Sequence, residues 1–298
     1  MERDCESELS KLNIEQNACI YHFGASVIHG QRSNILRLRI DGQIYLPDEL
    51  RGEPITAIAP YAFSDREPEE GDLCWMEEGA EDLSGLHRLN MEAVTEIRLP
   101  SGVREIGRYA FYRCRNLRKL VLSDALREIG GGALTGCRIR EVEIHFANGE
   151  QSALPSILDE MRYRILARLY YQEGKTAQVL FPEHYEEAVE NTPARILYTS
   201  HHGAGGYYRQ CFYNRALDYG KYDELLPRAI AEESEETVLR LVLGRLRYPY
   251  QLSAKAEESY REYLAGHLKT AARMLVAEED MEGLRFFSEN NVWTRPSI

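Results

Sequence analysis

The residues best suited to chemistry lie close together in the stretch YTSHHGAGGYYRQC, which ends at Cys211. His201 and His202 adjoin its glycine-rich run, so a nucleophilic thiol and a base could in principle meet there. Adjacent histidines diverge on a strand or a helix, however, and GAGG lacks the strand–GxGxxG–helix context of a phosphate-binding loop. We therefore interpret the run as a glycine-rich loop between two helices. A hydrolase or transferase site around these residues is the alternative.

The six cysteines are the next candidates for chemistry. They form no C-x-x-C pair and are too scattered for a disulfide framework, which predicts reduced thiols. Cys114 and Cys137 stand 23 residues apart in similar surroundings, but no further ligands accompany them at the spacing of a zinc finger. We expect both side chains to be small apolar members of a core. We expect neither a metal site nor a cofactor.

The charge of the chain disfavours two classes of partner. The net charge of −12 argues against nucleic acid or an anionic membrane as the main partner, because both attract a basic face. Residues 64–93 contribute −8 of this charge, since they hold ten acids and two arginines. This acidic segment has no EF-hand spacing, so we expect a solvated loop and not a calcium site. Its acids are Asp65, Glu67, Glu69, Glu70, Asp72, Glu77, Glu78, Glu81, Asp82 and Glu92.

The N-terminus suggests where the protein resides. It carries acids where a secretory signal needs bases, and no stretch of the chain approaches the ~18–20 apolar residues of a membrane span. The sequence as written therefore predicts a cytoplasmic protein that does not cross a membrane. A location at the cell surface is the alternative, which a leader in the full gene would support.

A repeat explains the spacing of the cysteines. Each unit holds an apolar–polar–apolar triplet, typical of a short half-buried strand, then a turn, an Ile-Gly pair and a short helical segment. One unit cannot bury its apolar face alone, but stacked units can, so the period predicts a solenoid. Consecutive units are 23 residues apart, and the step from Leu120 and Leu122 to Val142 and Ile144 in the following unit is 22 residues. The pairs that recur after 23 residues are Ile97 and Leu120, Leu99 and Leu122, Ile106 and Ile129, Gly107 and Gly130, Ala110 and Ala133, Phe111 and Leu134, and Cys114 and Cys137.

A degenerate unit precedes these. It is five residues longer between its strand and Ile58, and alanine stands where the later units have glycine. The acidic segment then interrupts the series, so we expect this insertion to leave the stack as a loop. The residues that take the inward roles in the degenerate unit are Ile44, Leu46, Ile58, Ala62 and Phe63.

These units resemble the BspA-like leucine-rich repeats over residues 94–145 and, less closely, over residues 44–63. The resemblance implies a right-handed solenoid with a parallel strand ladder on one face. The family uses such a face for binding, often in surface proteins of bacteria and some protists, and it brings no catalytic motif. The outward residues that we expect to contact a protein partner are Tyr45, Glu96, Arg98, Lys119, Val121, Glu141 and Glu143, with Gln43 beside them.

The apolar spacing changes from about Ser152 onward. Apolar residues three and four apart predict an amphipathic helix over 152–174. The stretches that begin at Ser234 and Asp280 align with an offset of 46 residues, and both residues are good helix N-caps. This internal repeat suggests an array of helical hairpins of the HEAT or ankyrin kind. Further helices are expected at 182–191, 207–218, 221–231, 235–246, 254–277 and 281–290.

The sequence thus predicts an α+β chain with two domains. Residues 1–148 form a leucine-rich repeat domain with its acidic insertion, and residues 149–298 form an all-α domain that resembles helical repeats. We expect a non-catalytic protein-interaction module of a bacterium, and the alternative is a secreted or surface adhesin-like protein. The many tyrosines of the second half are either core residues or an aromatic binding surface.

Overall fold

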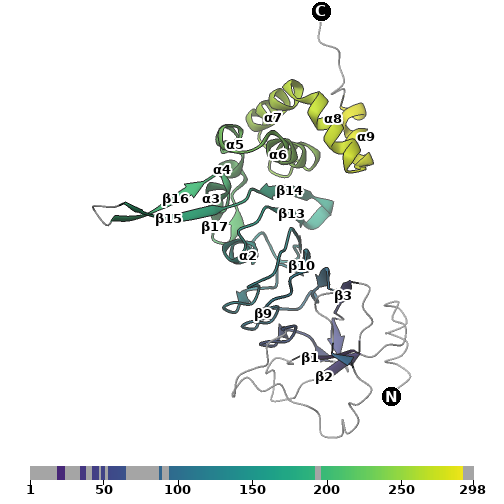
Figure 1. Ribbon diagram of the computed structural model, residues 1–298. Coiled ribbons are helices and arrows are strands. Elements are labelled where there is room, and N and C mark those ends of the chain that lie inside the picture. Colours follow the sequence, from purple (N-terminus) through teal and green to yellow (C-terminus); the bar gives the residue numbers. More distant parts are fainter. Residues whose placement is uncertain are drawn as a thin grey trace, which may run out of the picture. The chain divides into compact units, whose positions relative to one another are not determined.

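The computed structural model describes residues 19–23, 34–37, 42–46, 48–50, 53–64, 87–88, 94–191 and 196–290. The chain divides into two compact units, Met1–Met161 and Arg162–Ile298 (Figure 1). The domain boundary that we predicted at residue 148 lies inside the first unit. No helix in the described part of the chain combines the length and the apolar character that crossing a membrane requires.

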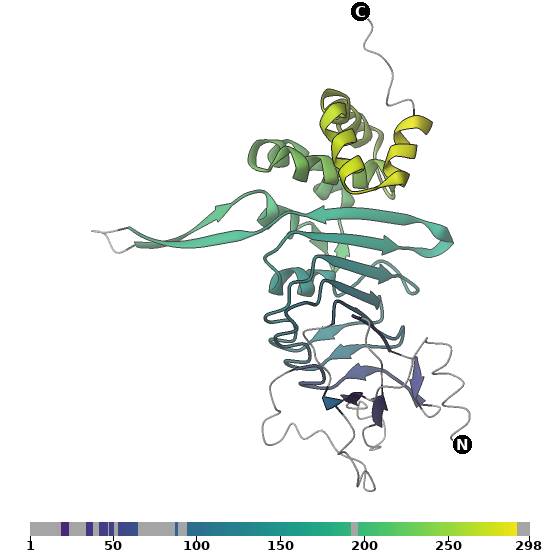
Figure 2. The same ribbon diagram turned by 45° about the vertical axis from the view of Figure 1, so that its right-hand side comes forward.

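The first unit contains the predicted solenoid. Its ladder runs β3 (Gln43–Tyr45), β8 (Glu96–Arg98), β10 (Lys119–Ser123) and β12 (Glu141–His145), and all neighbours pair in parallel. Figure 2 shows these strands stacked one above another. One repeat therefore corresponds to one coil of the solenoid. The inward residues that lie opposite one another in register are Ile44, Ile97, Leu120 and Val142.

A second, shorter ladder runs through the same coils. It consists of β6 (Ala57–Ile58), β9 (Glu105–Ile106) and β11 (Glu128–Ile129), again in parallel. Ile58, Ile106 and Ile129 lie opposite one another, which confirms the predicted alignment of consecutive units. Ile106 is fully buried, whereas Ile129 in the last rung is partly exposed.

Side chains in the interior of the solenoid contact residues of the neighbouring coil. Phe63 stacks on Phe111 with ring centroids 5.1 Å apart. Cys114 Sγ donates to the carbonyl of Phe63 at 3.3 Å, and Cys137 Sγ donates to the carbonyl of Phe111 at 3.1 Å. Both thiols are buried, which confirms them as core residues. The described residues hold no cluster of side chains suited to a metal ion.

The glycine of the Ile-Gly pair lets consecutive coils approach closely. A Cβ atom on Gly107 would overlap the backbone of Ala59 and Pro60, and one on Gly130 would overlap the backbone of Arg108. The longer first coil places its extra residues in a small hairpin of β4 (Glu49–Leu50) and β5 (Glu53–Pro54). The acidic segment lies mostly outside the described residues.

A small sheet that the repeat does not predict lies near the N-terminus. β1 (Cys19–Phe23) pairs antiparallel with β2 (Asn34–Arg37) and parallel with β7 (His87–Arg88). The two residues of β7, together with Ser64, are the part of the acidic segment that the structure describes. The first unit ends with α2 (Leu154–Glu160), which buries Leu154, Ile157 and Leu158.

The helix predicted over 152–174 is wrong beyond α2. The chain becomes extended at Met161, and β13 (Ile165–Tyr170) follows. Side chains of β13 are buried alternately, so Ile165, Ala167 and Leu169 form the inner face. The run contains apolar residues at both strand and helix spacings, and this ambiguity caused the error.

Strands also replace the next two predicted helices in the second unit. The first hairpin pairs β13 with β14 (Thr176–Phe181). The second pairs β15 (Tyr185–Asn191) with β16 (Ile196–His202), where a helix was expected at 182–191. The prediction at 207–218 fails because only α3 (Gly205–Tyr208) is helical, and the two-residue strands β17 (Phe212–Tyr213) and β18 (Ala216–Leu217) follow it.

The rest of the second unit is helical, which confirms a mostly helical C-terminal region. Ser234 Oγ accepts a bond from the amide of Thr237 at 3.2 Å, and Asp280 Oδ1 accepts one from Gly283 at 2.8 Å, so both predicted N-caps are confirmed. The single helix predicted over 254–277 is divided at His267. The helices are α4 (Tyr219–Glu224), α5 (Leu226–Glu232), α6 (Glu235–Arg247), α7 (Ala254–Gly266), α8 (Leu268–Ala277) and α9 (Met281–Glu289).

Candidate functional site

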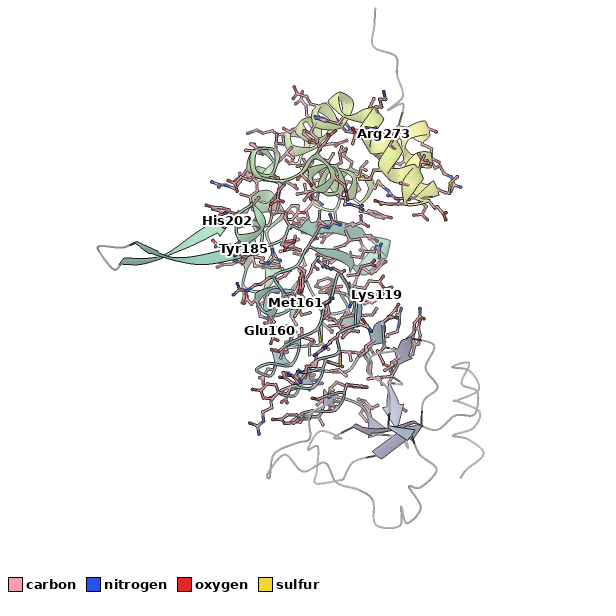
Figure 3. All side chains as sticks on the ribbon, viewed as in Figure 1. Lys119, Glu160, Met161, Tyr185, His202 and Arg273 are labelled. Carbon is pink, nitrogen blue, oxygen red and sulfur yellow. The ribbon has the colours of Figure 1, made fainter. Side chains whose placement is uncertain are left out.

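The outward face of the ladder is held by ion pairs between neighbouring coils. Lys119 of β10 is labelled in Figure 3. Its Nζ lies 3.7 Å from a carboxylate oxygen of Glu96 on β8 and 2.9 Å from one of Glu143 on β12. Burial alone favours the neutral amine, but the bond to Glu143 and the nearby carboxylates prevail and raise the pKa of Lys119. The register explains this arrangement, because these positions face the same way in consecutive coils.

A second contact lies at the β3 edge of the ladder. The guanidinium of Arg98 lies 5.5 Å from the ring centroid of Tyr45, and the Tyr45 hydroxyl donates to Gln43 Oε1 at 2.7 Å. Tyr45 is 38% exposed even with this stacking. The stacked pair therefore offers an amphipathic ring and a cation to a partner, two groups enriched at protein interfaces.

The residues predicted to contact a protein partner differ in how far they are exposed to solvent. Val121 is 1% exposed and Glu143 is 8% exposed, so neither can contact a partner in this conformation. Facing outward on a strand does not by itself keep a side chain in solvent. The residues of the set that keep accessible surface are Tyr45, Glu96, Arg98, Lys119 and Glu141. Their role in binding stays a prediction.

The thiol of Cys211, the nucleophile of the alternative catalytic site, is buried and protonated. Cys211 is 3% exposed, and burial raises its pKa to about 12. The thiol is therefore protonated near neutral pH, whereas nucleophilic catalysis needs the thiolate. Its Sγ lies 3.5 Å from the carbonyl of Tyr207.

The two histidines lie on β16, where adjacent residues belong to opposite faces of the hairpin. The ring of His202 lies 5.5 Å from the ring of Tyr185, which pairs with it at the base of the hairpin (Figure 3). The side chain of His201 lies outside the described set. Their position on a strand agrees with the expectation that adjacent histidines diverge.

The glycine-rich run has a packing role. It joins strand β16 to helix α3. We expected a loop between two helices, and this was wrong because the element before the run is a strand. Gly203 has a φ of +77°, and a Cβ atom on Gly205 would overlap the carbonyl of Glu183. The amide of Ala204 donates to Glu233 Oε1 at 2.7 Å. The positive φ of Gly203 and the crowded backbone at Gly205 therefore account for these two glycines without a bound phosphate.

Four tyrosines of the second unit are buried in its core, Tyr208, Tyr219, Tyr222 and Tyr260. Tyr208, Tyr222 and Tyr260 have no exposed surface. The Tyr222 hydroxyl donates to the carbonyl of Leu180 at 2.7 Å and accepts from its amide at 2.9 Å. Tyr185, Tyr207 and Tyr213 are 54%, 43% and 77% exposed, so the second unit also presents aromatic side chains to solvent.

A buried ion pair in the second unit escaped the sequence interpretation. Arg245 is fully buried and contacts Asp223 through two bonds, Nε to Oδ1 at 2.8 Å and Nη2 to Oδ2 at 3.0 Å. Tyr260 also donates to Asp223 Oδ1 at 2.8 Å. The position of Arg245 within the apolar run LVLGRL is the signal that could have revealed it. Because the partners satisfy one another, the cluster is structural.

Comparisons with known proteins agree with the repeat. Residues 89–154 match the BspA type leucine rich repeat region in six copies, which confirms the resemblance over that stretch. No curated protein matches the chain.

Two solved structures are similar at low sequence identity. One is a leucine-rich repeat protein from Bacteroides ovatus ATCC 8483, with 19% identity over 46% of this chain and 38% of that chain, and a TM-score of 0.24. The other is a leucine-rich repeat protein from Eubacterium ventriosum ATCC 27560, with 12% identity over 61% of this chain and 49% of that chain, and the same TM-score of 0.24. The chain therefore spans less than half the length of either relative.

Proposed function

We propose that this chain is a non-catalytic interaction module that binds a segment of a protein partner on the outward face of its ladder. The leucine-rich repeat match supports an interaction module in general terms. The observation that carries the specific proposal is the in-register row of accessible aromatic and charged side chains on β3, β8 and β10. Such a row can distinguish partners by matching charge and shape from coil to coil.

The electrostatics of the face indicate how a partner is recognised. Lys119 is already paired with two carboxylates, so its charge is largely neutralised within the ladder. Tyr45 and Arg98 stack on one another, and both keep accessible surface. We therefore expect them to dominate the binding energy, because aromatic and arginine anchors carry most of it at protein interfaces.

The test is affinity capture from a lysate of the source organism with three forms of the full chain. Tyr45→Ala combined with Arg98→Ala removes the anchors, and Tyr213→Ala combined with Arg273→Ala is the matched control on exposed residues of the second unit. Proteins retained by the wild type and the control but lost with the first variant support the ladder face. Identical sets of retained proteins for all three forms would discredit it.

Cellular location remains part of the proposal. A cytoplasmic module is our expectation, and cell fractionation with an antibody to the chain tests it. Recovery at the cell surface would favour the adhesin-like alternative.

A further inference from the structure

The coils of the solenoid carry charge opposite to that of the whole chain. Residues 94–145 hold ten lysines and arginines and six acids, whereas the chain as a whole has a net charge of −12. Nine of the ten cations are arginines. The excess positive charge therefore belongs to the repeat itself.

Five of these arginines lie in the segments that precede two consecutive ladder strands, residues 113–118 before β10 and residues 138–140 before β12. The amide of Arg140 donates to the carbonyl of Arg118 at 2.7 Å, so these two residues occupy the same position in neighbouring coils. The amide of Arg118 donates in turn to the carbonyl of Thr95 at 2.8 Å, so the row of arginines ends there. We call this set the arginine edge, and its members are Arg113, Arg115, Arg118, Arg138 and Arg140.

Several charges of the arginine edge have no acidic counterpart in the described part of the chain. Arg113, Arg115 and Arg138 are exposed and form no ion pair there. The guanidinium of Arg113 lies 5.2 Å from the ring centroid of Tyr112, and that of Arg118 donates to the carbonyl of Arg115 at 2.6 Å. These contacts orient the guanidinium groups of Arg113 and Arg118, and neither group forms an ion pair with the residues that the structure describes.

The spacing of the coils brings like charges together. Neighbouring strands lie ~4.8 Å apart, so Arg115 and Arg138, which hold equivalent positions in consecutive coils, repel one another unless an anion lies between them. A guanidinium presents a planar fork of donors that fits a carboxylate with two parallel bonds. The edge is thus preorganised for several carboxylates at once.

We propose that the arginine edge binds an acidic segment of a protein partner, a run of aspartates and glutamates. Nucleic acid fits less well, because the edge spans only two coils and the net charge of −12 repels a long polyanion. The edge uses residues other than those of the ladder face. The two proposals can therefore fail independently.

The experiment measures fluorescence anisotropy of a labelled peptide of ten glutamates with the full chain at low salt. The edge variant is Arg115→Glu with Arg138→Glu. The control is Arg273→Glu with Arg285→Glu, which changes the net charge equally at exposed positions of the second unit. We expect the edge variant to weaken binding at least tenfold and the control to change it less than twofold. Arg115→Gln with Arg138→Gln should give an intermediate loss, and thermal melting checks that every variant folds.

Four results would overturn the proposal. The first is absence of peptide binding by the wild type, and the second is equal binding by the edge variant and the control. The third is tighter binding of a ten-nucleotide single strand than of the peptide. The fourth is peptide binding only after the acids between residues 65 and 82 are replaced by amides, which would assign the edge to the chain's own acidic segment.

Discussion

At the scale of single residues, Glu160 completes the solenoid. In the earlier coils the amide of Phe63 donates to the carbonyl of Ala110, and that of Phe111 donates to the carbonyl of Ala133. The amide of Leu134 in the last coil donates instead to Glu160 Oε2 at 3.0 Å, at the end of α2. A side-chain carboxylate thus takes the place of the carbonyl that a further coil would supply.

This capping bond predicts a contrast between two substitutions. Glu160→Ala leaves the Leu134 amide without an acceptor, so the free energy of unfolding should fall by ~1–3 kcal/mol. Glu160→Gln keeps an acceptor oxygen and should cost less than half as much. Urea unfolding of the two variants checks this. Equal losses would show that the bond does not stabilise the coil.

The same residue predicts a dependence on pH. Burial raises the pKa of Glu160 above its ordinary value, although the bond from Leu134 opposes this. The folded state therefore holds the proton more tightly than the unfolded state, and the stabilisation is full at low pH and declines as pH rises through the carboxylate range. The wild type should gain stability relative to Glu160→Gln between pH 7 and pH 4. A difference between the two proteins that does not change with pH would contradict the assignment.

Burial of the Cys211 thiol predicts that it is alkylated slowly in the folded protein. Because burial raises the pKa of Cys211 to about 12, iodoacetamide should alkylate it in the native protein at least 100-fold more slowly than in the unfolded chain at pH 8. Mass spectrometry of the labelled peptides measures both rates. Alkylation at the rate of a free thiol would revive the hydrolase or transferase hypothesis.

At the scale of elements, the sequence predicts structure wherever a long-range pattern exists. The 23-residue period places Ile106 opposite Ile129 because stacked coils cover the apolar face of each repeat, and the register confirms this pairing. Capping residues likewise predict the starts of α6 and α9. The strands from 165 to 217 could not be predicted in this way, since apolar residues such as those of β13 fit a helix or a strand until their partners are known.

The candidate site, too, could be predicted from the sequence only in part. The register predicts which residues share the outward face, but the burial of Val121 and Glu143 depends on surroundings that spacing does not encode. The alternating pattern also carries no information on ion pairing. The bonds of Lys119 to its neighbours therefore emerge only from the structure.

The buried cluster that joins α4, α6 and α7 predicts a large loss of stability. Asp223→Ala leaves the charge of Arg245 without its partner, so the free energy of unfolding should fall by ~3–5 kcal/mol. Arg261→Ala removes an exposed pair with Glu257 and should cost less than ~0.5 kcal/mol. Guanidinium unfolding checks both variants. Similar losses would mean that the cluster is not an essential part of the core.

At the scale of the whole molecule, charge is segregated along the chain. Residues 64–93 carry a net charge of −8, while residues 94–145 carry ten cations against six acids. Sites that bind partners by charge matching need such local excess, since an even mixture of charges neutralises itself. On our proposal, the local positive charge of residues 94–145 serves recognition of an acidic partner.

The central claim is that the solenoid of the first unit receives the protein partner. Hydrogen–deuterium exchange of the full chain, with and without a partner obtained by capture, tests it most directly. Binding should slow amide exchange in peptides that cover β8 and β10 and leave α6 to α9 unchanged. Slowed exchange confined to residues 162–298 would contradict the claim.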